Sequence, residues 1–217
     1  MTDTSLRNKV FNYIKSQILN GQLKHGDAII ESKMAEELGV SRTPIREAIQ
    51  LLEMEGLVES TPNKGIVILG ISAQDVQDIY AIRCLVEGLA ARWATGRLTS
   101  AQIKELKKTL DLMEFYANKD DMNELTELDN HFHQLIYKAS GSRILKQTLG
   151  TLHQFVQLAR LESLMVPHRL EDTLHEHRAI LSAFLEKDPT KAEKAMSDHV
   201  QKASQNIIHA HRESLSK

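Results

Sequence analysis

The hydrophobic pattern of residues 73 to 214 has helical periodicity throughout, and this constrains the fold more than any other feature of the 217-residue chain. Breaks in the pattern coincide with Gly96, Asn118, Gly141, Pro167 and Pro189, which are residues that end helices or favour turns. The pattern predicts helices over roughly 73–95, 100–117, 121–139, 142–165, 170–187 and 190–214. We therefore expect an all-α antiparallel bundle with a core able to hold a ligand.

The first seventy residues show a different order of elements. A helical pattern runs from Ser5 to Gly21, and a loop is predicted for 21–30. A short second helix is predicted to end at Gly39. Thr43 can then cap a third helix that has Pro44 at its first position, where the missing N–H costs nothing. This succession predicts two short helices joined by a tight turn.

Two runs of β-type residues follow, at 57–60 and 66–69, and the turn 61–65 between them carries Lys64. Paired strands after a helix-turn-helix predict a wing. The fold class expected is thus mainly α, with a winged helix-turn-helix domain at 1–70 and an all-helical domain at 71–217.

The exposed side of the predicted third helix and its leading turn carry side chains that contact phosphates and bases. These residues are Ser41, Arg42, Thr43 and Arg46. The alternative is that they only cap the helix or carry solvated charge, but their place before a wing favours DNA binding. The net charge is −2, and residues 1–70 carry eight Lys/Arg against nine Asp/Glu. Affinity must then come from a few well-placed cations and from two copies acting together.

The segment Glu31 to Gly65, and above all its core 38–48, resembles the winged-helix signature of the GntR family. The resemblance implies that operator DNA is contacted by Ser41, Arg42, Thr43 and Arg46, and that the wing tip, Lys64 and Gly65, reaches the minor groove. Ser32 stands where the fatty-acid-responsive member of the family has a DNA-contacting arginine. We therefore expect a different operator.

Histidine is concentrated in the C-terminal part: nine of the ten lie beyond residue 130. Asp129 and His133 are four residues apart, so on one helix they project from the same face and can chelate one ion. His177 and His199 fall on two later predicted helices, although His175 fits the spacing equally well. One carboxylate and three imidazoles suit Zn²⁺, Ni²⁺, Mn²⁺ or Fe²⁺. A single histidine is more often a surface or core residue than a ligand.

The C-terminal domain resembles the FCD ligand-binding domain of the FadR subgroup. The resemblance implies a divalent metal, zinc foremost, held by Asp129, His133, His177 and His199. It further implies a small carboxylate effector that completes the metal's coordination and is gripped by Arg83. The alternative for Arg83 is a surface salt bridge to Glu87 at i,i+4.

Together these features predict a homodimeric transcriptional regulator that binds a palindromic operator and is not an enzyme. Repression relieved by a small organic acid is the expected logic, with activation as the alternative. A metalloenzyme and a regulator that senses the metal itself are the rival functions; the absence of an HExxH sequence speaks against the first. The lack of a signal peptide or apolar span and the single Cys84 predict a cytoplasmic protein that does not enter the membrane.

Overall fold

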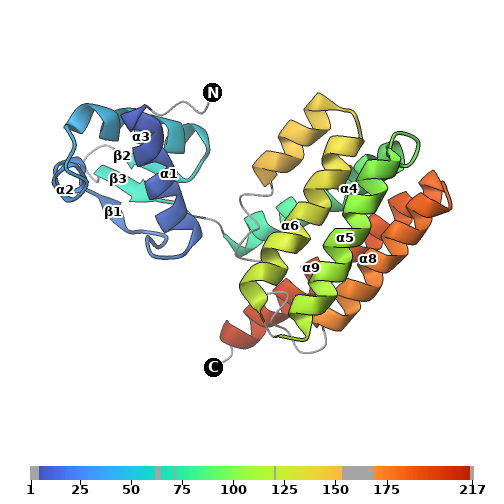
Figure 1. Ribbon diagram of the computed structural model, residues 1–217. Helices are drawn as coiled ribbons and strands as arrows, with labels where there is room; N and C mark the ends of the chain where they lie inside the picture. Colours follow the sequence, from blue (N-terminus) through green and yellow to red (C-terminus); the bar gives the residue numbers. More distant parts are fainter. Residues whose placement is uncertain (1–4, 62–64, 71, 120, 153–168, 216–217) are drawn as a thin grey trace. The chain divides into compact units, whose positions relative to one another are not determined.

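The computed structural model describes residues 5–61, 65–70, 72–119, 121–152 and 169–215 (Figure 1). The chain divides into two compact units, Met1–Ser72 and Ala73–Lys217. Among the helices that the structure describes, none combines the length and apolarity that a bilayer-spanning segment requires.

The N-terminal unit consists of three helices and a small antiparallel sheet in its described residues. Its elements are α1 (Leu6–Leu19), β1 (Ala28–Ile29), α2 (Glu31–Glu37), α3 (Arg42–Met54), β2 (Val58–Thr61) and β3 (Gly65–Ile68). The strands are ordered β1-β3-β2, with Ser60 opposite Ile66. The predicted winged helix-turn-helix is confirmed. The prediction of a loop over 21–30 was wrong for Ala28 and Ile29, which pair with β3; two residues are too few to show a periodicity.

Helix α3 begins two residues earlier than predicted. Its N-cap is Ser41, so Thr43 lies inside the helix and does not cap it, and Pro44 is in the first turn rather than at the first position. The first-turn N–H groups have no intrahelical partner, so proline is tolerated there as well. The apolar side of α3 is buried against the rest of the unit: Ile45, Ala48, Ile49 and Leu52. Residues between these positions are therefore turned outward.

The C-terminal unit is helical in all of its described secondary structure, and its helices run side by side (Figure 1). They are α4 (Ala73–Thr95), α5 (Ser100–Ala117), α6 (Met122–Ala139), a helical stretch at 143–152, α8 (Arg169–Leu185) and α9 (Pro189–Leu215). The predicted all-helical fold is confirmed. Pro167 and the remainder of the predicted helix 142–165 lie outside the described residues. Pro189 is the first residue of α9 rather than a break before it, because the Asp188 carboxylate accepts hydrogen bonds from the N–H groups of Thr190 and Lys191.

Helices α4, α5, α6, α8 and α9 surround a common interior. α4 packs on α6 and α9, and α8 packs on α9. Apolar side chains fill most of this interior, including Phe132, Ile136, Ile180, Met196 and Val200. A group of buried charged and imidazole side chains occupies the rest of it.

A candidate nucleic-acid interface and a candidate metal centre

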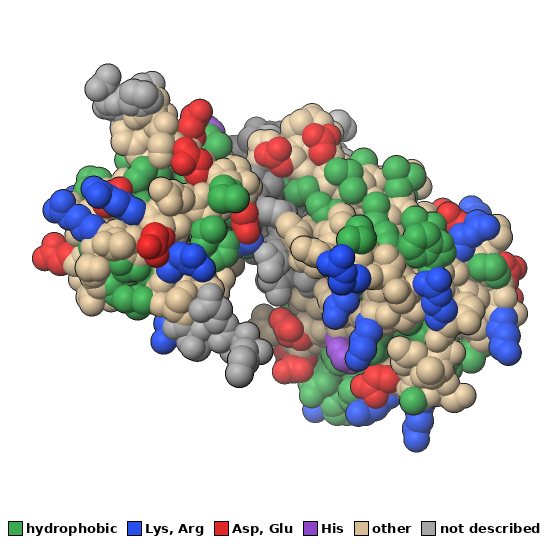
Figure 2. Space-filling view, turned by 90° about the horizontal axis from the view of Figure 1, so that it is seen from above, with side chains coloured by type: hydrophobic (Ala, Val, Ile, Leu, Met, Phe, Trp, Pro, Cys, Tyr) green, Lys and Arg blue, Asp and Glu red, His purple; other side chains and the backbone are tan. Residues whose placement is uncertain are grey.

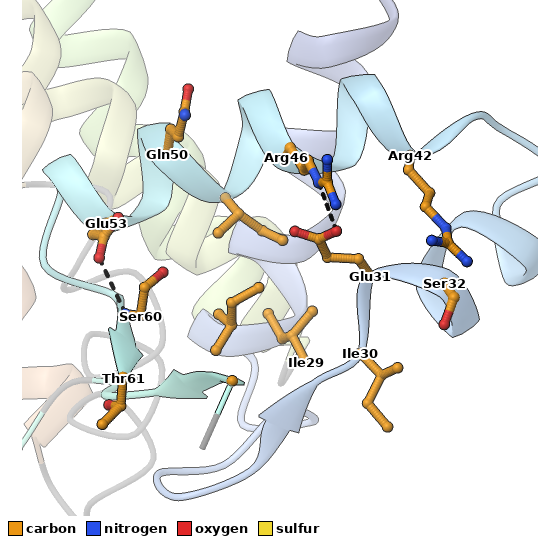
Figure 3. A pocket seen from close by; sticks show the side chains of 13 residues that line it. Ile29, Ile30, Glu31, Ser32, Arg42, Arg46, Gln50, Glu53, Ser60 and Thr61 are labelled. Atoms are coloured by element: carbon orange, nitrogen blue, oxygen red, sulfur yellow. Dashed lines mark hydrogen bonds and ion pairs between the residues drawn. The ribbon is translucent and has the colours of Figure 1, made fainter. Parts of the chain in front are cut away.

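A groove of about 790 Å³ lies on the N-terminal unit between α2, α3 and the sheet (Figure 3). Its polar lining comes from Glu31, Ser32, Arg42, Arg46, Gln50, Glu53, Ser60 and Thr61. On the face shown in Figure 2, basic side chains of this unit are interspersed with acidic ones rather than gathered in one patch. On that face, any attraction for an anionic ligand therefore depends on individual side chains.

The predicted contact residues of α3 are exposed and lie at or near this groove. Ser41, Arg42, Thr43 and Arg46 all face solvent, and both arginines line the groove. Arg46 donates from Nε to Oε2 of Glu31 at 2.7 Å. Gly65 begins β3 opposite Thr61 and has a φ of +79°, which favours glycine. Lys64 lies outside the described residues.

Several groove residues were missed in the sequence. Gln50 is one helical turn after Arg46, so its spacing alone could have indicated it. Ser60 and Thr61 required knowledge of the sheet: the N–H of Ser60 donates to Oε1 of Glu53 at 3.1 Å, which ties β2 to α3 (Figure 3). No sequence pattern reveals that contact.

In the C-terminal unit, the structure brings together the four residues singled out as a ligand set. Asp129 and His133 lie on α6, His177 on α8 and His199 on α9. One ligand atom from each residue lies within 4.8 Å of all the others, and all four side chains are buried. His175, the alternative by spacing, is on the exposed side of α8.

Two buried carboxylates orient two of these imidazoles. Nδ1 of His133 lies 2.7 Å from Oε2 of Glu87, and Nδ1 of His199 lies 2.7 Å from Oε2 of Glu176. An Nδ1–H donated to a carboxylate leaves the Nε2 lone pair free, which is how carboxylates prepare histidines as metal ligands.

The two Nε2 atoms lie 3.2 Å apart. Facing lone pairs at that distance repel each other unless a proton or a cation lies between them. Two nitrogens bound to one zinc ion at about 2.0–2.1 Å would be separated by about 2.8–3.4 Å for angles between octahedral and tetrahedral. The donor set therefore fits a divalent ion.

His177 is also a competent ligand. Its ring stacks on Phe132 with centroids 4.3 Å apart, and Nε2 lies 3.4 Å from Oδ1 of Asp129. Neither ring nitrogen has a hydrogen-bond partner among the described residues. Burial, reinforced by His199, holds the pKa of His177 well below its usual value. The ring is thus neutral at neutral pH and has a lone pair to offer.

Charged side chains contact Glu176, the carboxylate that orients His199. Arg169 binds Glu176 through both terminal nitrogens, at 2.9 and 2.8 Å, and Nζ of Lys202 lies 3.2 Å from Oε1. Burial opposes ionisation of Glu176, but hydrogen bonds from His199 and Arg169 outweigh it and lower its pKa to about 2. Glu176 is therefore an anion that offsets the charge of the site.

Arg83 lies on α4 and reaches the site through Glu87. Its Nε donates to Oε1 of Glu87 at 2.6 Å, so the i,i+4 pair exists, but it is buried rather than on the surface. Burial opposes the charged form of Arg83, but the Glu87 carboxylate, together with Tyr80 and Tyr137, outweighs burial and raises its pKa. Nη1 is buried without a hydrogen-bond partner among the described residues. Glu87 thus bridges Arg83 to His133 while part of the guanidinium remains available.

Comparisons with known proteins agree with both halves of this description. Residues 6–68 match the gntR family of bacterial regulatory proteins, and residues 78–202 match the FCD domain. The uncharacterized HTH-type transcriptional regulator YdhC of Bacillus subtilis is 32% identical over 92% of this chain and 89% of its own length. The HTH-type transcriptional repressor RspR of Escherichia coli is 27% identical, with coverages of 92% and 87%.

Among solved structures, McbR/YncC of Escherichia coli superposes with a TM-score of 0.73 at 26% identity, over 97% of this chain and 99% of that one. These relatives are transcriptional regulators and not enzymes, as the sequence predicted. The matches span both units, and this chain belongs to the GntR family of bacterial transcriptional regulators, with an FCD domain at its C-terminal end.

Proposed function

We propose that this protein is an operator-binding repressor whose DNA affinity is controlled by a small carboxylate bound at a metal site in its C-terminal unit. The observation that carries the proposal is the convergence of four buried ligand atoms beside Arg83, whose Nη1 lacks a partner among the described residues. Buried unpaired donors are costly, so such a donor calls for a partner such as a water, an ion or a ligand.

The proposed metal ligands are Asp129, His133, His177 and His199, with Glu87 and Glu176 orienting two of the imidazoles. Three imidazoles and a carboxylate favour Zn²⁺, and Ni²⁺, Mn²⁺ or Fe²⁺ fit the same set. A divalent ion bound there would supply a positive, electrophilic centre for an anionic oxygen. Arg83 would hold the other carboxylate oxygen through its terminal nitrogens.

On the DNA side, we assign operator contacts to Ser41, Arg42, Thr43, Arg46, Lys64 and Gly65. The first four are exposed at the start of α3, which is the end of a recognition helix that enters the major groove. The protein would act in the cytoplasm as a homodimer, with two such helices about 34 Å apart on a palindromic site. Repression is the proposed logic because the similar RspR is a repressor.

The test is selection of genomic fragments by the purified, metal-loaded protein, followed by titration of the bound fragments with a panel of small mono- and dicarboxylates. We expect enrichment of a palindromic sequence and its release by one class of acid, which is recovered unchanged. Release by chelator or by metal alone would assign the signal to the ion instead. Rapid turnover of the acid would favour a metalloenzyme, and failure to retain any fragment would refute the proposal.

A further inference from the structure

We propose that Glu31 is a positioning residue for operator reading: it holds Arg46 by Nε and leaves the two terminal nitrogens of the guanidinium directed at the DNA. This inference rests on the proposed DNA-binding function. Nothing in the sequence pattern singled out Glu31, because its role depends on a contact between two helices.

The geometry of the pair is asymmetric. Glu31 is the first residue of α2, and Arg46 lies on α3, fifteen positions later. Their side chains point toward one another at the groove (Figure 3). The Arg46 side chain is 63% exposed, whereas that of Glu31 is 27% exposed. The carboxylate is therefore the recessed partner, and the guanidinium is the one that a ligand can reach.

The atom used by Arg46 matters. Its bond to Glu31 is made by Nε at 2.7 Å. Arginine reads guanine through a bidentate pair of hydrogen bonds to O6 and N7, and the fork of Nη1 and Nη2 can make such a pair while Nε stays on Glu31. The contact thus fixes the side chain without consuming the donors that read a base.

The pair should matter more for recognition than for folding. Exposed ion pairs contribute little to stability, because solvent screens them and ordering two side chains costs entropy. Arginine has a long stem with many rotamers, and ordering it at an interface opposes binding. Holding Arg46 in place beforehand reduces that cost on the correct sequence.

Glu31 should have a second and opposite effect on DNA that carries the wrong sequence. Its carboxylate lies within a groove that would face phosphates, and it therefore weakens non-specific attraction. Loss of Glu31 should weaken specific binding and strengthen, or leave unchanged, non-specific binding. A purely structural role would lower both affinities together.

The experiment compares Glu31→Ala and Glu31→Gln with the control Glu47→Ala. Glu47 is exposed on α3 next to Arg46 but does not line the groove, so its removal changes the charge equally and leaves Arg46 alone. The probes are the duplex that the wild-type chain selects from a random pool and a scrambled duplex of equal length. Affinities are measured at two salt concentrations, and melting temperatures are recorded.

We expect Glu31→Ala to lower the ratio of specific to non-specific affinity about three- to tenfold, which is part of the discrimination of one bidentate contact. Glu31→Gln, whose side-chain oxygen still accepts from Nε, should keep most of the ratio, and Glu47→Ala should keep all of it. An unchanged ratio in Glu31→Ala, an equal fall in Glu47→Ala, or no advantage of Gln over Ala would overturn the proposal. A wild-type chain that selects no duplex would refute DNA binding itself.

Discussion

His177 differs from its neighbours in the site because neither of its ring nitrogens is hydrogen bonded within the described residues. His133 and His199 each have a carboxylate on Nδ1, so they have a structural reason to be buried without a metal. Among the described residues, His177 stacks on Phe132, lies near the Asp129 carboxylate and packs against the rings of His133 and His199. Its burial is explained most simply by a ligand at the centre of the cluster.

Replacement of His177 by alanine should therefore abolish stoichiometric metal binding while the protein remains folded. Elemental analysis after dialysis measures the metal, and circular dichroism measures the fold. His175→Ala is the matched control, because His175 is two residues away on the exposed side of α8 and should keep full metal content. Full occupancy in His177→Ala, or loss in His175→Ala, would contradict the assignment.

The Glu176→Gln variant tests the orienting carboxylates. Glutamine keeps the volume of the side chain but removes the charge that faces Nδ1 of His199 and the Arg169 guanidinium. Loss of such a partner typically costs 10- to 100-fold in metal affinity, so we expect a fall of about that size in a competition titration with a chromophoric chelator. Glu171→Gln, exposed on the same helix, should bind metal like the wild type. Equal affinities for both variants would exclude an orienting role.

Arg83→Met separates effector binding from metal binding. Methionine fills much of the space of the arginine stem, and Glu87 still accepts from His133, so metal content should be retained. The affinity for the small carboxylate effector should fall by at least about tenfold, because one charge-assisted bidentate contact is lost. Isothermal titration with the releasing acid measures this. Arg92→Met, which removes an exposed arginine of α4 paired with Glu193, is the control. A response that survives in Arg83→Met would leave Arg83 as a partner of Glu87 alone.

At the scale of elements, the close approach of α4 and α9 aligns the two sides of the site, because α4 carries Glu87 and α9 carries His199. Gly88 permits this approach: a Cβ there would lie 2.3 Å from Oγ of Ser197 and 3.2 Å from the backbone oxygen of Glu193. The Ser197 hydroxyl also donates to the backbone oxygen of Cys84 at 2.9 Å. Bringing the helices together thus depends on one small residue.

Gly88→Ala should destabilise the protein by about 1–3 kcal/mol, as overpacking does, and should weaken metal binding because α9 is displaced. Adding Ser197→Ala should recover part of the loss. Gly150→Ala is the control, since a Cβ there meets nothing within 4 Å and alanine in a helix should stabilise by about 0.5–1 kcal/mol. Chemical denaturation measures the free energy of unfolding of all three variants. A Gly88→Ala variant as stable as the wild type would show that α4 and α9 can accommodate a Cβ at this position.

The ends of helices were predictable from the sequence where a glycine interrupts the helical pattern. Gly39, Gly96 and Gly141 end or separate helices as their sequence suggested, and the buried face of α3 followed from its spacing. β1 was not predictable, because its two residues acquire strand geometry only by pairing with β3. Glu87 and Glu176 could not be recognised either, since their roles arise from contacts with α6 and α9 that no local pattern encodes.

At the scale of the whole molecule, the proposal requires coupling between two units with different chemistry. The N-terminal unit has few basic residues with which to bind DNA. Modest changes in the relative placement of a dimer's two N-terminal units should therefore have large effects on operator affinity. An effector shifts that placement only if it binds the DNA-competent and DNA-incompetent arrangements with different affinities. Such coupling is typically worth a 5- to 150-fold change in affinity.

The most direct test is the operator affinity of metal-loaded and chelated wild-type protein, each measured by fluorescence anisotropy with and without the releasing carboxylate. We predict at least a tenfold loss of affinity on adding the acid to the metal-loaded protein, and little change when the acid meets the chelated protein or His177→Ala. An acid that releases the operator equally well in all three would contradict a metal-centred effector site.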